Sequence, residues 1–304
     1  MNNTIYVGCD VKDKVRRQRL YAGQLFIIPP RPSTIALCEF AKGMIKEAFG
    51  SIDPLQAQYH MPVEQYVAIV APLKPKFIHH PESMRLMRAL LADCGCDLAE
   101  TYIDVPRLRM VTSDGYLTSG VGYAHHPHRD TWYSAPMAQL NWWLPIYDIE
   151  SENSMAFHPV YWSKAVKNGS REFNYYVWNS EGRKDAAQHI KSDTRKQPKP
   201  EEPVELEPEI RIIVPAGGVV LFSAAQLHSA VPNTAGRARY SIDFRTVNLT
   251  DLRAGEAAPN LDTHPIGTSL RDFVRGTDGA AMPEDVVKKY DNAPVGDGVL
   301  IYRP

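Results

Sequence analysis

The chain has 304 residues, of which 44% are hydrophobic and 23% charged, and its formal net charge is −1. These values suit a globular protein with a buried core and give no reason to expect nucleic acid or an anionic membrane as the main partner. No apolar segment approaches bilayer length, and no secretory signal is recognisable, so we expect a cytoplasmic protein. With only four cysteines, Cys94 and Cys96 are interpreted as reduced thiols at a helix end rather than half of a metal site.

The N-terminal third predicts one strand followed by helices. Apolar residues over 20–28 predict a strand that Pro29 ends. With Ser33 as the N-cap, apolar residues at helical spacing predict a helix to about Phe49, and a second such pattern predicts a helix over about 82–94.

From Ile103 onward, short β-type runs alternate with turn signals. Many short strands separated by glycine and proline indicate a sandwich or barrel, and the lack of strand–helix alternation argues against a doubly wound fold. The predicted strands are 107–112, 116–123, 138–147, 155–157, 210–214, 219–223 and 239–247.

Two segments depart from this pattern. Residues 180–209 are charged and contain several prolines, which predicts a long surface loop. This loop could be a lid over a site or an insertion without a role, and the two readings are equally favoured. Residues 249–304 form a C-terminal extension with a short helix predicted over 284–290 and no assigned function.

The segment His128-Arg129-Asp130 places an imidazole and a carboxylate two residues apart. On a strand, alternate residues share a face, so both groups would point to one side and Arg129 to the other. A third ligand must come from elsewhere, and His228, just after the apolar run 219–222, is the candidate. It follows Asp130 by 98 residues (228 − 130), so we expect a different strand to supply it.

Two histidines and one carboxylate on one face of an octahedron leave three positions open, as in non-haem iron(II) oxygenases. These positions accept a 2-oxo acid and dioxygen. A zinc site would more typically be tetrahedral, with one open position for water. Because a His-x-Asp tripeptide alone is a weak signal, the assignment needs a second motif.

That second motif is the alternating segment 239–245. Arg239, Ser241, Asp243 and Arg245 share one predicted face of the strand, and apolar or aromatic residues share the other. A cationic row inside a β-domain needs an anionic partner, because unpaired buried charge is costly. The distal carboxylate of 2-oxoglutarate suits Arg239, whose guanidinium can bind it bidentately, and Ser241 could donate a further hydrogen bond.

Three motifs therefore follow one another: His-x-Asp at 128–130, a Gly-Gly-apolar strand at 214–222 leading to His228, and Arg-x-Ser at 239–241. In this order they resemble the Fe(II)/2-oxoglutarate-dependent oxygenases, and their spacing and flanks are most similar to the phytanoyl-CoA dioxygenase-like family. The resemblance covers about residues 105–247.

The resemblance implies a mainly β, α+β chain built on a cupin-like double-stranded β-helix, or jelly roll. We expect a single oxygenase domain over 1–304. Its parts are an N-terminal strand and helices that support the barrel (1–104), a jelly-roll core (105–248), and the C-terminal extension (249–304).

The resemblance also implies a dioxygenase that takes Fe(II), the co-substrate 2-oxoglutarate and O2. Decarboxylation of 2-oxoglutarate to succinate and CO2 would drive oxidation of a C–H bond, most often hydroxylation, with desaturation and cyclisation as variants. Halogenating relatives lack the metal-binding carboxylate, whereas Asp130 is present here. We expect a small-molecule metabolite as substrate and a biosynthetic role, with neither nucleic acid nor membrane as a partner. Oligomeric state stays open, a homodimer being one option.

Further residues receive roles by position. Asn141 is expected near 2-oxoglutarate, because relatives place polar residues of this strand there. Trp132, Tyr133, His126 and Arg245 are candidates for substrate contacts. Each could instead be structural, and Arg245 could pair with Asp243.

Some assignments have rivals. His125 and His126 compete with His128, His158 competes with His228, and Arg237 and Arg245 compete with Arg239. A cupin-type metalloenzyme using His126-x-His128 without 2-oxoglutarate is one alternative function, although the glutamate usual in cupins is missing. A non-catalytic, ligand-binding member of the fold is the other.

Overall fold

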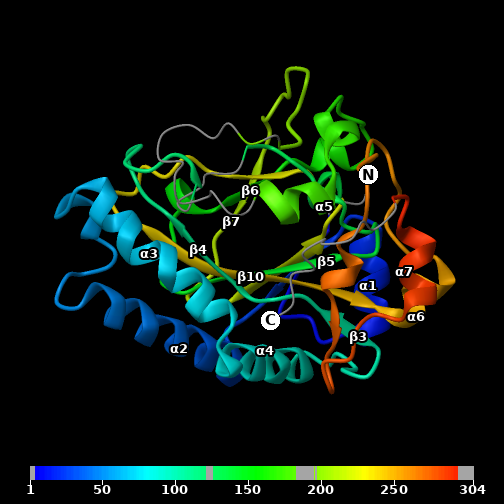
Figure 1. Ribbon diagram of the computed structural model, residues 1–304, viewed down its shortest axis with the longest axis horizontal. Coiled ribbons are helices and arrows are strands. Elements are labelled where there is room, and N and C mark those ends of the chain that lie inside the picture. The colour runs from blue at the N-terminus through cyan, green and yellow to red at the C-terminus, as the bar shows by residue number, and fades with distance from the viewer. Residues whose placement is uncertain (1–3, 121–125, 183–194, 196, 294–304) are drawn as a thin grey trace.

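The computed structural model describes residues 4–120, 126–182, 195 and 197–293. Two β-sheets lie face to face, and long helices cover the outer side of the larger sheet (Figure 1). Apolar residues of both sheets share one buried cluster, which includes Trp143 and Phe222 from the larger sheet and Phe157 from the smaller one. The two sheets therefore form a sandwich, which also encloses polar side chains between the sheets.

The larger sheet has the strand order β1-β2-β8-β5-β10-β3-β11, with β4 pairing beside β3 on β10. β1 and β2 run parallel, and the other neighbouring strands of this sheet pair in antiparallel fashion. The strands are β1 (Ile5–Val7), β2 (Leu25–Ile28), β3 (Thr101–Ile103), β4 (Arg107–Val111), β5 (Leu140–Pro145), β8 (Val219–Ser223), β10 (Arg239–Asn248) and β11 (Val274–Arg275).

The smaller sheet has the order β7-β6-β9, formed by Ile210–Ile212, Met155–Phe157 and His228–Ala230. His128 adds a single antiparallel bridge to His228 at the free side of β9. Successive strands therefore alternate between sheets: β4 large, His128 small, β5 large, β6 and β7 small, β8 large, β9 small, β10 large. This is the winding of a double-stranded β-helix, and it confirms the predicted fold class.

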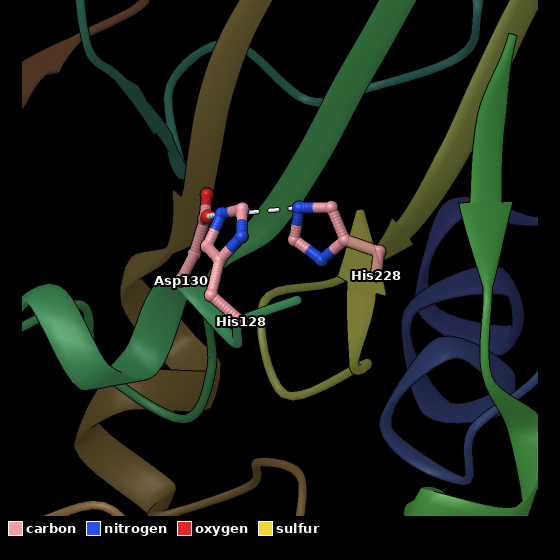
Figure 2. A group of neighbouring side chains, drawn as sticks. All are labelled: His128, Asp130 and His228. Atoms are coloured by element: carbon pink, nitrogen blue, oxygen red, sulfur yellow. Dashed lines mark ion pairs between the residues drawn. The ribbon is translucent and has the colours of Figure 1, made fainter. Parts of the chain in front are cut away.

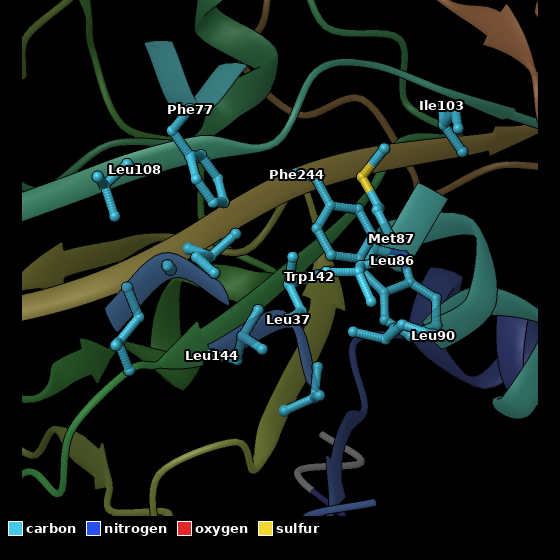
Figure 3. Close-up of a cluster of buried hydrophobic side chains, with 14 of the residues drawn as sticks. Leu37, Phe77, Leu86, Met87, Leu90, Ile103, Leu108, Trp142, Leu144 and Phe244 are labelled. Carbon is cyan, nitrogen blue, oxygen red and sulfur yellow. The ribbon is translucent and has the colours of Figure 1, made fainter. Parts of the chain in front are cut away.

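The helices α2 (Pro32–Phe49), α3 (Val63–Ile78) and α4 (Pro81–Asp93) pack against the larger sheet. Figure 3 shows the buried core between them, where Leu37, Phe77 and Leu90 meet Trp142 and Phe244. None of the helices among the described residues combines the length and apolarity that a membrane crossing requires. The other α-helices in the described part of the chain are α1 (Asp13–Tyr21), α5 (Tyr175–Val177), α6 (Leu249–Ala254) and α7 (Glu284–Tyr290).

β10 links the core to the interior of the sandwich. Tyr240, Ile242 and Phe244 point into the helix-covered core, while Arg239 and Asp243 face a cavity between the sheets. The predicted alternation of this strand is thus confirmed. One strand buries apolar side chains on one face and presents charged ones on the other.

Several predicted boundaries differ from the structure. Residues 20–28 are not one strand, because Leu20 and Tyr21 belong to the last turn of α1 and the strand begins only at Leu25. α2 and α4 each begin at a proline. The N-cap of α2 is Arg31, two residues before the predicted Ser33, and α4 begins one residue before its predicted start, with His80 as its N-cap. Proline fits the first helical turn because its missing N–H would have no helical acceptor there.

Two further differences concern α3 and the run 116–123. α3 is not among the predicted helices and contains Pro72 and Pro75, residues that usually interrupt a helix. Residues 116–120 form no strand, and 121–123 lie outside the described residues. The helix predicted over 284–290 is confirmed as α7.

We expect Leu37→Ala to lower the free energy of unfolding by about 2–5 kcal/mol, because it leaves a cavity in the core. Leu37 is fully buried, whereas Ile35 on the same helix is 45% exposed. Ile35→Ala is the matched control and should change stability by less than about 0.5 kcal/mol. Urea unfolding measures both, and equal losses would contradict this description of the core.

Candidate metal centre and its cavity

Three predicted ligands converge between the sheets (Figure 2). The backbones of His128 and His228 exchange two hydrogen bonds, each 3.0 Å from N to O. Oδ1 of Asp130 lies 3.2 Å from Nε2 of His128 and 3.8 Å from Nε2 of His228. The three ligand atoms lie within 4.8 Å of one another, which is the spacing that a single metal ion needs.

The outer nitrogen of each imidazole is held by a backbone carbonyl. Nδ1 of His128 lies 2.7 Å from the oxygen of His126, and Nδ1 of His228 lies 3.0 Å from the oxygen of Gln226. A carbonyl can only accept, so each Nδ1 carries the proton and each Nε2 keeps its lone pair for a metal.

Asp130 is held through its other oxygen. Nδ2 of Asn141 donates to Oδ2 at 3.0 Å, and the guanidinium of Arg245 lies 3.6 Å from it. Oδ1 is thus left facing the histidines. Burial by itself would raise the pKa of Asp130, but the contact with His128 and the positive charge of Arg245 bring this pKa well below its usual value.

Burial, and then the neighbouring His128, lower the pKa of His228 to about 3. The side chain is therefore neutral at physiological pH, while Asp130 is ionised. Metal ligands need both states, because a protonated imidazole cannot bind and a carboxylate binds as the anion.

Arg129 points away from the ligands, as predicted, and fastens the segment. Its buried guanidinium pairs with Asp262 at 3.1 Å and donates to the carbonyl oxygens of Tyr161 and Lys164. Asp262 belongs to the C-terminal extension, which thereby supports the metal segment. Removing either partner would leave an uncompensated buried charge.

One local prediction is wrong. His128 and Asp130 do not share a strand, because Asp130 opens a short 3-10 helix over Asp130–Tyr133. The 3-10 turn places the carboxylate of Asp130 beside the imidazole of His128. The two side chains therefore lie on the same side, as expected, although they do not share a strand. The expectation that another strand supplies His228 is confirmed by β9.

Arg239 and Ser241 lie buried on β10, and Arg239 lines the same cavity as the metal ligands. Nη1 of Arg239 donates to the carbonyl oxygens of Asn153 and Ser154 at 3.0 and 3.1 Å. Among the described residues, Nε of Arg239 and Oγ of Ser241 have no hydrogen-bond partner. Burial lowers the pKa of Arg239 to about 10, so the guanidinium stays charged. An anion reaching both groups would satisfy them.

His128, Asp130, His228 and Arg239 line a cavity of about 380 Å³. Aromatic and charged side chains make up most of its other walls. They include Lys74, Asp104, Arg107, Arg109, Tyr133, Trp143, Phe173, Tyr175, Trp178, Arg195, Asp243, Arg245 and Asp272, and the amide of Asn141 also lines the cavity.

The predicted substrate residues separate into two groups. Tyr133 and Arg245 line the cavity. Trp132 is fully buried elsewhere and donates from Nε1 to Asp262 at 2.8 Å, and Nε2 of His126 lies 2.7 Å from the oxygen of Pro198. Neither is among the residues described as lining the cavity, which argues against the expected substrate contacts of Trp132 and His126.

Arg245 and Asn141 have structural partners at the site. Arg245 lies 3.5 Å from Asp104 and 3.2 Å from Asp243, so the pairing with Asp243 expected as its alternative role is present. Asn141 lines the cavity and accepts a hydrogen bond from Gln139 while donating to Asp130. Its expected contact with 2-oxoglutarate stays a prediction.

The rival ligands lie apart from the candidate metal group formed by the described residues. His158 is bound between the Leu206 oxygen and the Ser229 hydroxyl. Arg237 forms an ion pair with Glu150 instead of lining the cavity. Cys94 and Cys96 are not in the group, and His125 lies outside the described residues.

Sequence reasoning missed most of the charged wall. Lys74 comes from α3, and Arg107 and Arg109 come from β4. The alternation Arg107-x-Arg109 within a predicted strand was a usable signal, because it mirrors the charged row of β10. Lys74 offered none, since no helix was predicted around it.

No family model and no curated protein matches the chain. Among solved structures, it is similar to EvdO2 from Micromonospora carbonacea var. aurantiaca complexed with 2-oxoglutarate, at 12% identity and a TM-score of 0.44, over 79% of this chain and 92% of that one. It is also similar to SnoN, a non-heme alpha ketoglutarate dependent epimerase from nogalamycin biosynthesis, at 14% identity and a TM-score of 0.39, over 78% and 84% of the two chains. ThoJ, a non-heme monooxygenase, matches at 13% identity and a TM-score of 0.41, over 84% and 83%. Sequence identities and TM-scores this low do not establish a function, so the geometry of the site must support it.

We expect His228→Ala to lower the affinity for Fe(II) by more than about 100-fold, since loss of a group that merely orients a ligand already costs about 10- to 100-fold. Anaerobic titration against a competing chelator measures this. His60→Ala, which removes an exposed imidazole, is the control and should bind as the native chain does. Equal affinity in both variants would contradict the assignment.

Proposed function

We propose that this chain is an Fe(II)- and 2-oxoglutarate-dependent oxygenase that hydroxylates a C–H bond of a small-molecule metabolite. In the balanced reaction, substrate, O2 and 2-oxoglutarate give hydroxylated substrate, succinate and CO2. The observation that carries the proposal is the pairing of a two-histidine, one-carboxylate group with a buried arginine whose Nε has no partner among the described residues.

The donor set fits iron(II). His128, Asp130 and His228 would occupy one face of an octahedron and leave the opposite face for a 2-oxo acid and O2. Bound there, the metal would supply the one-electron chemistry that activates dioxygen. The protein contributes two neutral imidazoles and one ionised carboxylate, each oriented by a hydrogen bond on its outer atom. Retention of Asp130 fits hydroxylation rather than halogenation.

Arg239 and Ser241 fit the co-substrate. The guanidinium of Arg239 would bind the distal carboxylate of 2-oxoglutarate, and the hydroxyl of Ser241 would donate to it. Both are buried, so this charge-assisted contact would form away from water. The carbonyls of Asn153 and Ser154 already fix the guanidinium plane, which reduces the entropy lost on binding.

The site draws on every part of the chain. Lys74 comes from the N-terminal region, the metal group from the core, and Asp272 from the C-terminal extension. We therefore propose that residues 1–304 act as one oxygenase unit. Arg239 would have no evident task in a cupin-type enzyme that does not use 2-oxoglutarate.

The test is anaerobic addition of Fe(II) and 2-oxoglutarate, followed by the visible metal-to-ligand charge-transfer band. We expect a band in the native chain and, in Arg239→Ala, an increase in the 2-oxoglutarate concentration required of at least about 30-fold, because removing one partner of a buried charge pair costs about 2 kcal/mol or more.

Arg237→Ala is the matched control, because Arg237 pairs with Glu150 and is not in the cavity wall described here. It should titrate as the native chain does. Absence of the band in a folded, iron-loaded native chain would contradict the proposal and favour the cupin-type or ligand-binding alternatives.

A further inference from the structure

The guanidinium of Arg129 joins the two segments that carry the metal ligands. Arg129 lies between His128 and Asp130 in the chain, and only 2% of its surface is exposed. Its Nη1 donates a hydrogen bond to the carbonyl oxygen of Ala225, which lies in the turn between β8 and β9 that leads to His228. One buried side chain therefore bonds to the second metal-bearing segment while its backbone belongs to the first.

Three further acceptors surround the same guanidinium. Nη2 of Arg129 donates to the carbonyl oxygen of Tyr161 at 2.7 Å and to that of Lys164 at 3.0 Å, and Nε lies 3.1 Å from Oδ2 of Asp262. The rigid fork of an arginine can bond to several acceptors at once, which the single ammonium of a lysine could not do in this geometry. The carboxylate of Asp262 balances the buried positive charge.

The C-terminal extension also holds the residues that follow the metal-binding carboxylate. Oδ1 of Asp262 accepts a hydrogen bond from Nε1 of Trp132 at 2.8 Å. Beside it, the hydroxyl oxygens of Thr131 and Thr263 lie 2.8 Å apart. The residues before and after Asp130 are thus bonded to the same two neighbouring residues of the extension.

These contacts matter because Asp130 lies in a 3-10 turn rather than in a strand, so its position is not set by the register of a sheet. The backbone bridge between His128 and His228 restrains one pair of residues. A metal site needs all three ligand atoms at fixed distances, and groups that orient the ligands affect metal affinity strongly. The bonds made by Arg129 and Asp262 supply restraints on the rest of both segments.

We propose that Arg129 and Asp262 are positioning residues that set the separation of the two metal-bearing segments and thereby the affinity for Fe(II). Neither is among the described residues that line the cavity, so both act through the three ligands. The C-terminal extension thus controls the metal centre although none of the three ligands belongs to it. This inference rests on the metal assignment in the proposed function.

The test uses Asp262→Asn, which keeps the shape of the side chain and removes its charge. We expect this variant to bind Fe(II) about tenfold more weakly in anaerobic competition with a chelator, the lower end of the effect of groups that orient a metal ligand. With saturating Fe(II) and 2-oxoglutarate, its charge-transfer band should shift in wavelength relative to the native chain, because the ligand geometry changes.

Asp251→Asn is the matched control. Asp251 is also buried and pairs with an arginine, Arg17, at 2.5 Å, and neither residue is in the described cavity wall. Both variants should unfold at a lower urea concentration than the native chain, because each removes the charge of a buried ion pair. Only Asp262→Asn should weaken Fe(II) binding, whereas a merely structural role predicts native affinity in both.

Trp132→Phe is the milder second variant, and it carries the test if Asp262→Asn does not fold. It removes only the N–H that bonds to Oδ1 of Asp262 and keeps an aromatic ring in the core. We expect its affinity for Fe(II) to fall by about fivefold, the equivalent of one hydrogen bond. Near-ultraviolet circular dichroism checks that each variant is folded.

Native affinity for Fe(II) in folded Asp262→Asn, or in Trp132→Phe where that variant replaces it, would overturn the inference. So would an equal loss of affinity in Asp251→Asn, since general destabilisation would then explain the effect. A native chain that binds Fe(II) beside unaffected variants defeats only the positioning role. A native chain that does not bind Fe(II) defeats the metal assignment and this inference together.

Discussion

The site depends on the two backbone hydrogen bonds that His128 and His228 exchange. They join segments 100 residues apart in the chain (228 − 128) and bring two imidazoles to the same side of the smaller sheet. Side-chain contacts alone could not hold long loops in this register, because ordering a loop costs conformational entropy. The backbone pairing of His128 with His228 closes the smaller sheet and at the same time brings the metal ligands together.

β10 carries the second constraint. Its apolar face is pinned in the core by Tyr240 and Phe244, so its opposite face must place Arg239 and Asp243 inside the sandwich. A slip of one residue would exchange the two faces, which the core would not accept. The strand therefore orients the arginine proposed to bind 2-oxoglutarate with the same packing that stabilises the fold.

The interior of the protein contains several buried charged side chains, and most of them form ion pairs with one another. Arg245 lies among Asp104, Asp130 and Asp243, while Arg129 is held by Asp262. Such pairs add little net stability, but breaking one is expensive, so they fix geometry more than they strengthen the fold. Asp130 gains a fixed orientation from this network, with one oxygen held and the other available.

The sequence predicted the structure best where a periodic residue pattern also placed residue types that a metal or an anion requires. The alternation of β10 predicted both the core face and the charged face, and the spacing of His128, Asp130 and His228 predicted ligands from separate segments. Trp132 was expected at the mouth of the pocket because it follows the metal motif, but its side chain is fully buried and binds Asp262. Lys74 was missed because α3 contains prolines that obscure a helix, and a contact between a helix and a cavity has no local signature.

The most direct measurement is anomalous diffraction at the iron edge from crystals loaded anaerobically with Fe(II) and 2-oxoglutarate. The account predicts an iron peak between Nε2 of His128, Nε2 of His228 and Oδ1 of Asp130, with the distal carboxylate of 2-oxoglutarate on Arg239 and Ser241. An iron peak at another group of side chains, or 2-oxoglutarate bound at Lys74 and Arg109, would contradict it.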